Sequence, residues 1–239
     1  MWDRESSSVW SDYKNYYSWS TAGYMLAGFG VGAVVANTDL DSKFQSWYQQ
    51  HVRSSESDNI ANFVRPLGEG QYTIPVVAVL ALLNDTGWLD GQPVLQEVGQ
   101  WGDRVTRAYL VGAVPMLAMQ ELTGANRPSS PDPHSSWKPF SASNGVSGDA
   151  FMSSCLFISA ADMTDQPLAK GFFYACSFMV PWERIDLNQH FLSEAALGWW
   201  MGYLACRAVN QTELMTDRRV IFMPVINADM TGVGMTIKW

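Results

Sequence analysis

The sequence contains little charge, and positive charge is the scarcest. Only 16% of its 239 residues are charged, and 23 Asp and Glu outnumber 15 Lys and Arg, which gives a net charge of −8. A surface that binds nucleic acid needs a stripe of basic side chains to neutralise phosphates. The sequence has no such stripe, and this excludes nucleic acid as an expected partner.

Cysteine and histidine are also rare. Cys155, Cys176 and Cys206 are odd in number, and each lies in an apolar stretch. This pattern is typical of buried free thiols and indicates neither a disulfide framework nor a metal site. We therefore expect no metal. Of the three histidines, His51 lies in a polar amphipathic stretch, which indicates a solvated surface residue.

Hydrophobic runs long enough to cross a membrane are nearly absent. The longest uncharged stretch, residues 15–38, has the required length and carries Gly28 and Gly32 at the spacing of closely packed helices. Its glycines and polar residues favour a buried helix over a membrane span. The other apolar runs have about 13 residues, the length of core helices. Membrane association is therefore not favoured, and the oligomeric state stays open.

Helical periodicity dominates what the sequence does contain, and we predict an all-α fold of six or more helices in a single domain over residues 1–239. Asp41 is the predicted cap of the second helix. The stretch from residue 92 to Gly124 predicts one or two helices, with Gly124 as the terminating residue. Further helices are expected over residues 21–36, 58–64, 147–163, 168–179 and 187–209.

Two segments depart from the helical pattern. Residues 125–145 are rich in proline and serine, so they can form neither a long helix nor a central strand. A loop of this length inside a compact domain is usually functional, and we interpret it as a lid over a site. Residues 218–239 contain β-branched residues around an "NADMTG" turn, which predicts a short C-terminal β-hairpin.

The third histidine, His190, has an unusual neighbourhood. Arg184 precedes it by six residues and Glu194 follows it by four in "ERIDLNQHFLSE". On a helix that starts near Leu187, Glu194 would lie one turn beyond His190 on the same face. Its carboxylate would hold one ring nitrogen and leave the other free to react.

Three stretches, "QELTGANRP", "VSGDAF" and "ERIDLNQHFLSE", together resemble the motifs of the type 2 phosphatidic acid phosphatase superfamily, which includes class A acid phosphatases and vanadium-dependent haloperoxidases. They lie within residues 120–200. The matching positions are Arg127 and Pro128, Ser147 and Gly148, Arg184, and His190. The resemblance implies that family's helical core and favours the periplasm or cell envelope, although we expect no cleavable signal peptide within this chain.

The departures from the family pattern concern charge. Gln120 stands where the family has lysine, and Asp149 where it has a second histidine. Val146 replaces a proline, and Glu194 replaces an aspartate, which is a mild change. An aspartate titrates near 3.9 and is normally ionised at neutral pH, so Asp149 would not donate a proton as histidine does. The site should bind anions less tightly than the family's site.

The resemblance implies hydrolysis of a phosphate monoester, either a small molecule or a lipid, without a cofactor. His190 would attack phosphorus and form a phosphohistidine, while Glu194 orients the ring. Phosphate or vanadate could occupy the site. Its expected ligands are the side chains of Arg127, Arg184, Ser147 and Gln120 and the Gly148 N–H.

Asp149 leaves three outcomes open. Burial and Glu194 could raise its pKa, so that it acts as the acid and shifts activity to low pH. His134 and Lys138 could supply the missing acid and cation from the loop. Alternatively, Asp149 bonds to Arg127 or Arg184 and fills the phosphate site, which would make the protein a non-catalytic anion-binding or structural relative. A vanadate-dependent haloperoxidase ranks behind these, since the lysine and second histidine are replaced.

Overall fold

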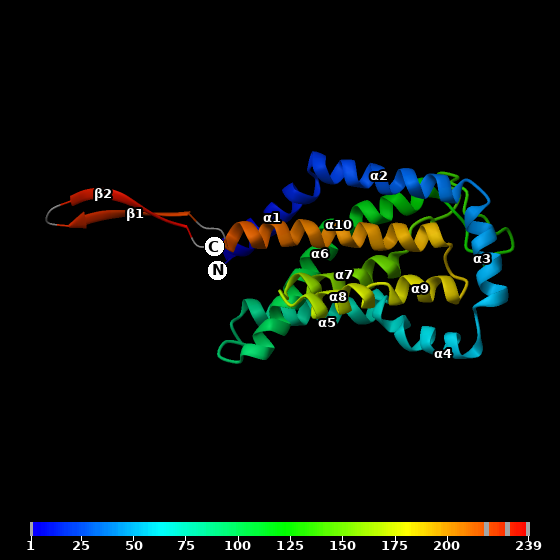
Figure 1. The fold of residues 1–239 in the computed structure, drawn as a ribbon, viewed down its shortest axis with the longest axis horizontal. Helices are drawn as coiled ribbons and strands as arrows, with labels where there is room; N and C mark the ends of the chain where they lie inside the picture. Colours follow the sequence, from blue (N-terminus) through cyan, green and yellow to red (C-terminus); the bar gives the residue numbers. More distant parts are fainter. Residues whose placement is uncertain (1, 218–219, 228–229, 238–239) are drawn as a thin grey trace.

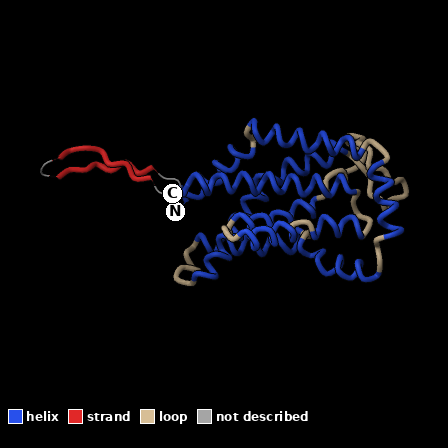
Figure 2. The backbone as a smooth tube through the Cα atoms, viewed as in Figure 1, coloured by secondary structure: helices blue, strands red, loops and turns tan. Residues whose placement is uncertain are grey.

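The computed structural model describes residues 2–217, 220–227 and 230–237, with side chains from residue 8 to residue 215. The described chain is mostly helical (Figures 1 and 2), which confirms the all-α class. The helices are α1 (Trp2–Tyr16), α2 (Trp19–Ala36), α3 (Leu40–His51), α4 (Ser55–Val64), the 3₁₀ helix η1 (Arg65–Leu67), α5 (Gly70–Asp85), α6 (Pro93–Thr123), α7 (Gly148–Asp162), α8 (Pro167–Cys176), α9 (Met179–Asp186) and α10 (Leu192–Asp217).

Two strands follow α10 in the chain. β1 (Val220–Asn227) and β2 (Met230–Ile237) pair antiparallel, with Val220 opposite Ile237 and Asn227 opposite Met230. The predicted hairpin over residues 218–239 also includes positions 218–219, 228–229 and 238–239, which lie outside the described residues. The complete hairpin therefore stays a prediction.

Helix α10 lies at the centre of the bundle and packs against α7, α6, α1 and α2 (Figure 1). Its contact with α7 is close because Gly198 and Gly202 lie there: a Cβ on Gly198 would collide with the Ser147 carbonyl, and one on Gly202 with the Ser154 hydroxyl. Glycine permits this approach of two helix backbones. Helices α7 and α10 consequently begin side by side, at one end of the bundle.

The core that holds these helices together is apolar. Phe151 and Ile158 of α7 and Met201 and Leu204 of α10 are almost fully buried. Each such side chain contributes about 1.5–3 kcal/mol on burial. The first turns of α7 and α10 are thus extensions of a rigid core, and side chains on them have fixed positions.

Helix α2 lies on the outside of α10 (Figure 1). Gly28 and Gly32 face α10, where a Cβ on Gly32 would come 2.9 Å from Leu197. The described buried residues of α2 are Thr21, Phe29, Gly32 and Ala36. The prediction of a buried helix is therefore wrong, because only one face of α2 packs on a neighbour and its opposite face is exposed.

Helix α6 is one continuous helix of 31 residues. Gly124 ends it with a φ of 57°, in the left-handed region, and its N–H donates to the Gln120 carbonyl, which confirms the predicted terminator. The predicted loop follows. Its backbone is tied to the end of α6, since Lys138 N donates to Thr123 O at 2.9 Å and Phe140 N to Glu121 O at 2.8 Å. These bonds fix the later part of the loop, and its role as a lid stays a prediction.

Asp41 does not cap the second predicted helix, and this prediction was wrong. It lies inside α3, which begins at Leu40, and its side chain is buried. Asp41 Oδ1 instead accepts a hydrogen bond from Ser193 N at 3.0 Å, which satisfies a free N–H in the first turn of α10. The carboxylate therefore caps a helix, but one that lies far along the chain.

Candidate functional site

His190 lies in the turn between α9 and α10 and not on a helix. Helix α9 ends at Asp186, and Asn188 adopts a φ of 58°. The backbone N–H groups of Gln189 and His190 both donate to the Arg184 carbonyl, at 2.9 and 3.0 Å. The predicted helix from residue 187 is therefore wrong, because the left-handed turn at Asn188 interrupts it and α10 begins only at Leu192.

His190 and Glu194 nevertheless make the contact that their spacing suggested. The distance between His190 Nδ1 and Glu194 Oε2 is 3.0 Å. The same carboxylate oxygen accepts from Phe191 N at 2.9 Å, so Glu194 caps α10 while it holds the ring. Within the described residues, His190 Nε2 has no hydrogen-bond partner. The ring is fixed through one nitrogen, and the other is free to react.

Asn144, in the loop before α7, completes the support of this pair. Its Nδ2 group donates to Glu194 Oε2 at 3.1 Å and to the Gln189 carbonyl at 3.3 Å. Both amide hydrogens of Asn144 are used in these bonds, so neither is donated to His190 Nδ1. The ring therefore carries its hydrogen on Nδ1 and donates it to Glu194 Oε2. Asn144 was not predicted from the sequence, because its "NG" context is typical of an ordinary turn.

The His190–Glu194 pair is buried, and burial favours the uncharged form of each group. Burial, together with the positive charges of Arg184 and Arg127, lowers the pKa of His190 to about 3. Burial raises the pKa of Glu194 well above its usual range, and its Oε1 atom has no partner in the described chain. At neutral pH the imidazole is therefore unprotonated, which is the form that a nucleophile requires.

Arg184 connects the first turn of α7 to α9. Its guanidinium donates from Nη1 to Asp149 Oδ2, and from Nε and Nη2 to both oxygens of Glu183. Glu183 is fully buried, whereas the Asp149 side chain is 33% exposed. The ion pair considered in the non-catalytic alternative is thus present between Asp149 and Arg184. The role of Glu183 was not anticipated from the sequence.

Asp149 lies against η1 and α9 as well as beside Arg184. Its Cβ is 2.8 Å from the position that a Cβ on Gly68 would take. Burial raises its pKa, the nearby Arg184 opposes that rise, and Glu69 adds to it. The raised pKa agrees in direction with the acid-shifted outcome, but its carboxylate neighbour is Glu69 and not Glu194.

Arg127 follows α6 in the chain and lies close to Gln189, the residue before His190. Its Nη1 atom donates to Gln189 Oε1 at 2.7 Å, and its side chain is exposed. Its charge acts on His190, Glu194 and Asp149. Arg127 therefore remains available to a ligand, in contrast to Arg184, which is occupied by two carboxylates.

The remaining positions of the motifs surround the start of α7. Ser147 caps this helix, with its Oγ accepting from Ala150 N at 3.2 Å. Gln120 donates from Nε2 to the Val146 carbonyl at 2.7 Å and so fixes the segment before the cap. Gly148, the first helical residue, is partly exposed beside Gln120. The helix N-terminus favours a negative group at this point.

His134 and Lys138, the two residues considered for rescue, lie in the loop away from this constellation. Both ring nitrogens of His134 contact loop atoms, with Nε2 at 3.2 Å from Asn126 Nδ2 and Nδ1 at 3.1 Å from Ser136 O. For Lys138, the contacts described above involve its backbone. In this conformation neither residue supplies an acid or a cation to His190.

No group of three or more His, Cys, Asp and Glu residues in the described part of the chain could hold a metal ion. Among the cysteines, Cys155 and Cys206 are buried free thiols and Cys176 is partly exposed. Comparison with known proteins gave no match to a family model, a curated protein or a solved structure. The function must therefore be argued from the geometry of the site.

Proposed function

We propose that the protein is a hydrolase of phosphate monoesters that works through a phosphohistidine and is most active in acid. The observation that carries this proposal is the neutral His190 ring, fixed at Nδ1 by Glu194, with Nε2 unpartnered and two arginines near enough to lower its pKa. A positioned nucleophile beside cationic groups is what phosphoryl transfer requires of a protein. The motif resemblance described above supports the same reaction class.

In the first step, His190 Nε2 attacks phosphorus, and an N–P bond forms as the P–O bond to the alcohol breaks. The leaving oxygen takes a proton from the protonated carboxyl of Asp149. Positive charge on the ring is stabilised by Glu194, which accepts from Nδ1–H. Arg127 and the N-terminus of α7 bind the phosphoryl oxygens.

In the second step, water attacks phosphorus and breaks the N–P bond. The Asp149 carboxylate accepts a proton from this water, inorganic phosphate leaves, and His190 returns to its neutral state. Asp149 thus acts as acid and then as base. Because it must begin protonated, the rate should rise as the pH falls toward its pKa.

In the resting state, two carboxylates of the protein itself occupy the guanidinium of Arg184. With Asp149 ionised, the guanidinium of Arg184 is satisfied by Asp149 and Glu183. Protonation of Asp149 removes one of these partners and frees donors for a phosphate. The same protonation therefore supplies the acid and opens the anion site, and both effects favour low pH.

The second candidate is a non-catalytic relative, and the Asp149–Arg184 ion pair is the observation that favours it. In this alternative the carboxylate fills the phosphate position permanently. A buried arginine with two carboxylate neighbours would then be a structural connection between α7 and α9.

Hydrolysis of p-nitrophenyl phosphate across pH 4 to 8 separates these candidates. We expect an acid optimum for the parent, loss of at least about a thousandfold in kcat for His190→Ala, and an optimum closer to neutral pH for Asp149→His. His51→Ala is the matched control, because His51 is an exposed histidine on α3, and it should leave the rate unchanged.

Two results would count against hydrolysis through His190. If the parent is inert at every pH and Asp149→His gains turnover, the non-catalytic candidate holds. If the parent is active and His190→Ala is equally active, another group is the nucleophile. Trapping of acid-labile, base-stable phosphate on the parent and not on His190→Ala would identify the intermediate directly.

A further inference from the structure

The outer surface of the helical bundle is unusually apolar. Large hydrophobic side chains point outward from several helices, including Leu26 and Val31 of α2, Val79 of α5, Val114 and Leu117 of α6, and Phe172 of α8. Val114 is 68% exposed and Leu26 75% exposed, so neither packs on the described chain. Apolar surface of this extent on a folded protein marks a contact with another apolar phase or partner.

The described ion pairs between helices lie at two levels of the bundle. At one level, which we call the Arg107 level, ion pairs connect Arg107 to Asp12, Asp103 and Glu213. Lys170 and Asp162 form another ion pair, and Arg104 acts on Asp162, which places them at this level as well. At the other level, the site level, Arg184 joins Asp149 and Glu183, close to Glu69 and Arg127.

Six chain segments contain no charged residue, and each lies wholly or in part between these two levels. They are residues 15–38, 70–84, 108–120, 150–161, 171–182 and 195–206. The last five contain roughly 12 to 15 residues, which as helix correspond to about 18–22 Å. Helices α2, α5, α6, α7 and α10 all contribute to this charge-free layer, although the second half of α5 packs beside Gly102 and so lies level with Asp103. Such a layer is not expected of a protein surrounded by water.

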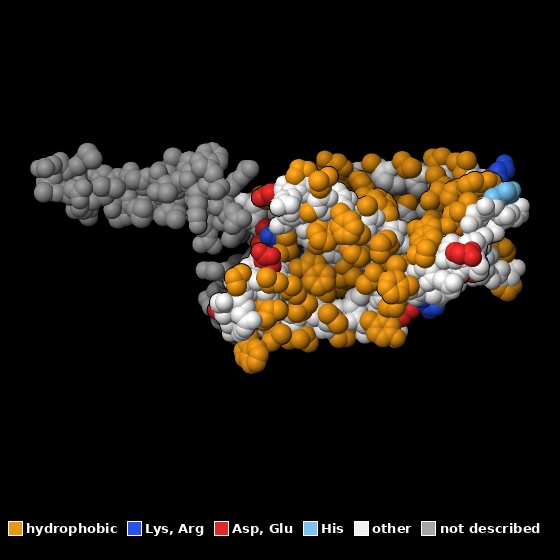
Figure 3. All heavy atoms as spheres, turned by 60° about the horizontal axis from the view of Figure 1, so that its bottom comes forward, with side chains coloured by type: hydrophobic (Ala, Val, Ile, Leu, Met, Phe, Trp, Pro, Cys, Tyr) orange, Lys and Arg blue, Asp and Glu red, His pale blue; other side chains and the backbone are white. Residues whose placement is uncertain are grey.

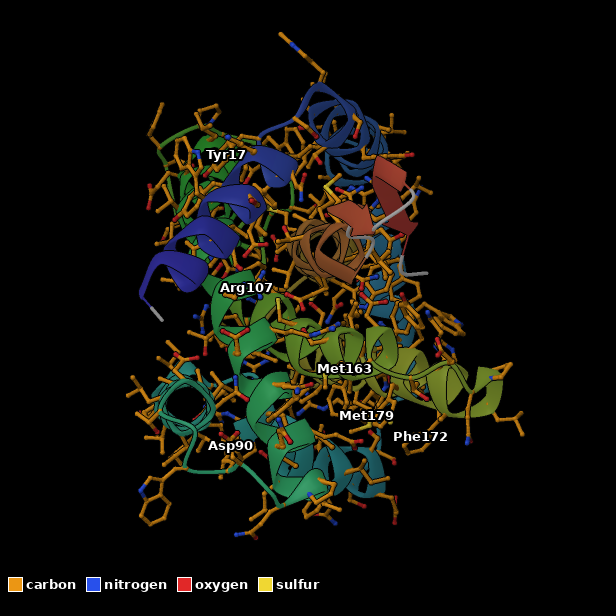
Figure 4. All side chains as sticks on the ribbon, turned by 90° about the vertical axis from the view of Figure 1, so that its left-hand side faces the viewer. Tyr17, Asp90, Arg107, Met163, Phe172 and Met179 are labelled. Atoms are coloured by element: carbon orange, nitrogen blue, oxygen red, sulfur yellow. The ribbon has the colours of Figure 1, made fainter. Side chains whose placement is uncertain are left out.

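The apolar side chains lie on more than one side of the bundle. Seen from one end, α2, α5 and α8 lie on different sides of α10, and the labelled Tyr17 and Phe172 are at opposite edges (Figure 4). From another direction, hydrophobic side chains fill the middle of the molecule, and Asp, Glu, Lys and Arg gather toward its two ends (Figure 3). One symmetric partner would cover a single patch and leave the others exposed.

We propose that the helical bundle is embedded in a lipid bilayer, with the Arg107 level in one headgroup region and the site level in the other. The charge-free layer is thinner than the hydrocarbon core of about 30 Å, a mismatch that bilayer thinning and snorkelling side chains accommodate. Exposed tryptophans flank the layer, as at membrane interfaces: Trp88 follows α5 beyond Asp85, and Trp47 lies on α3.

Two parts of the described chain have the length and apolar composition of a membrane-spanning helix. In the described chain α2 alone is long and apolar enough to cross a membrane, and α4 with η1 and α5 passes the same test as a pair bent by 43°. Helices α7, α8 and α9 have fewer than 18 residues and are too short for this test, whereas α6 and α10 are long enough but carry too many polar or charged residues. Their outward faces provide the apolar surface.

Spin labels on the full chain, reconstituted in phosphatidylcholine vesicles, test the proposal. Labels attached to Leu26→Cys, Ile74→Cys, Val114→Cys and Phe172→Cys, in a Cys176→Ser background, report contact with oxygen, which concentrates in lipid, or with a water-soluble nickel complex. We expect all four labels to prefer oxygen. Gln100→Cys is the matched control on α6, exposed but beyond Arg107, and should prefer nickel.

Each other outcome overturns the proposal. If all four labels prefer nickel, then the charge-free layer faces water. If the labels on one side are shielded from both reagents and the protein has the mass of a dimer, then a second copy of the chain covers the charge-free layer. The His190→Ala variant should give the parent's pattern, so failure of the embedding and failure of the hydrolase proposal are distinguishable.

Discussion

Two arginines with carboxylate partners lie at opposite ends of the bundle, and they serve different purposes. Arg107 uses all three of its nitrogens, with Asp12 bound through Nε and Nη2 and with Asp103 and Glu213 bound through Nη1. It joins α1, α6 and α10, and Asp12 is fully buried. Arg184 also bonds to two carboxylates, but it does so next to His190.

The difference lies in what remains unpaired. Every guanidinium nitrogen of Arg107 and of Arg184 has an acceptor, so the two arginines differ in the residues around them and not in their own hydrogen bonds. Near Arg184, no described residue bonds to His190 Nε2 or to the buried Glu194 Oε1, and the described contact of Arg127 is with the amide of Gln189. A cluster that stabilises a fold uses its donors up, whereas a site must leave some for a ligand. Incomplete pairing, rather than the presence of charge, distinguishes the site.

Breaking the Arg107 cluster should give the largest effect. Arg107→Met keeps the aliphatic stem but leaves Asp12 buried without a cation, which should lower the free energy of unfolding by about 3–5 kcal/mol. Chemical denaturation followed by tryptophan fluorescence measures this. Lys43→Met removes an exposed ion pair and should cost less than about 1 kcal/mol. Equal losses in the two variants would show that the cluster has no structural role.

Glu194→Gln should sharpen the contrast, because it should affect the rate more than the fold. The pKa of Glu194 is raised, so glutamine resembles its protonated form and can still accept from Phe191 N. Unlike the carboxyl group of glutamate, the amide cannot ionise as positive charge develops on the ring, and we expect kcat to fall about 100-fold, or about 2.7 kcal/mol, with little change in KM.

The control for this variant is Glu121→Gln, which changes an exposed glutamate at the end of α6 and should leave kcat unaltered. Thermal unfolding of Glu194→Gln should stay close to that of the parent. A kcat within twofold of the parent would show that Glu194 only caps α10.

The sequence predicted the pairs that are close in the chain better than those that are distant. The four-residue spacing of His190 and Glu194 indicated their contact correctly, although the backbone between them is a turn and not a helix. Asn144 and Glu183 were missed because their roles depend on contacts made by folding: Asn144 reaches a carboxylate 50 residues away. The position of Asp149 beside Arg184 was anticipated only as one of several outcomes.

The predictions of the fold were also correct for local features and wrong for features that depend on distant parts of the chain. Gly124 was recognised as the end of α6 because a left-handed glycine is a local signal. The exposure of α2 was not recognised from the sequence, because glycines and apolar residues at helical spacing suit both a buried helix and a helix in contact with lipid. Which of the two applies depends on how many neighbours the helix has, and this is a property of the whole bundle.

Asp149→Asn should give the smallest effect, a change in the pH dependence of stability. Burial raises the folded pKa of Asp149 above its ordinary value of 3.8, so the folded state binds the proton more tightly than the unfolded state. The resulting stabilisation is complete below pH 3.8 and is lost as the pH rises through the folded pKa. Asparagine does not titrate, so the melting temperature of the variant should fall less over this interval than that of the parent.

Melting temperatures measured from pH 3.5 to 7 for the parent, Asp149→Asn and Asp132→Asn test this expectation. Asp132 is an exposed loop carboxylate, and its replacement should leave the slope of the parent unchanged. If Asp149→Asn loses stability more steeply than the parent as the pH rises, then the Arg184 charge outweighs burial and Asp149 is ionised throughout. In that case Asp149 could not serve as the acid, and the Arg184 cluster would be a closed structural connection like the one around Arg107.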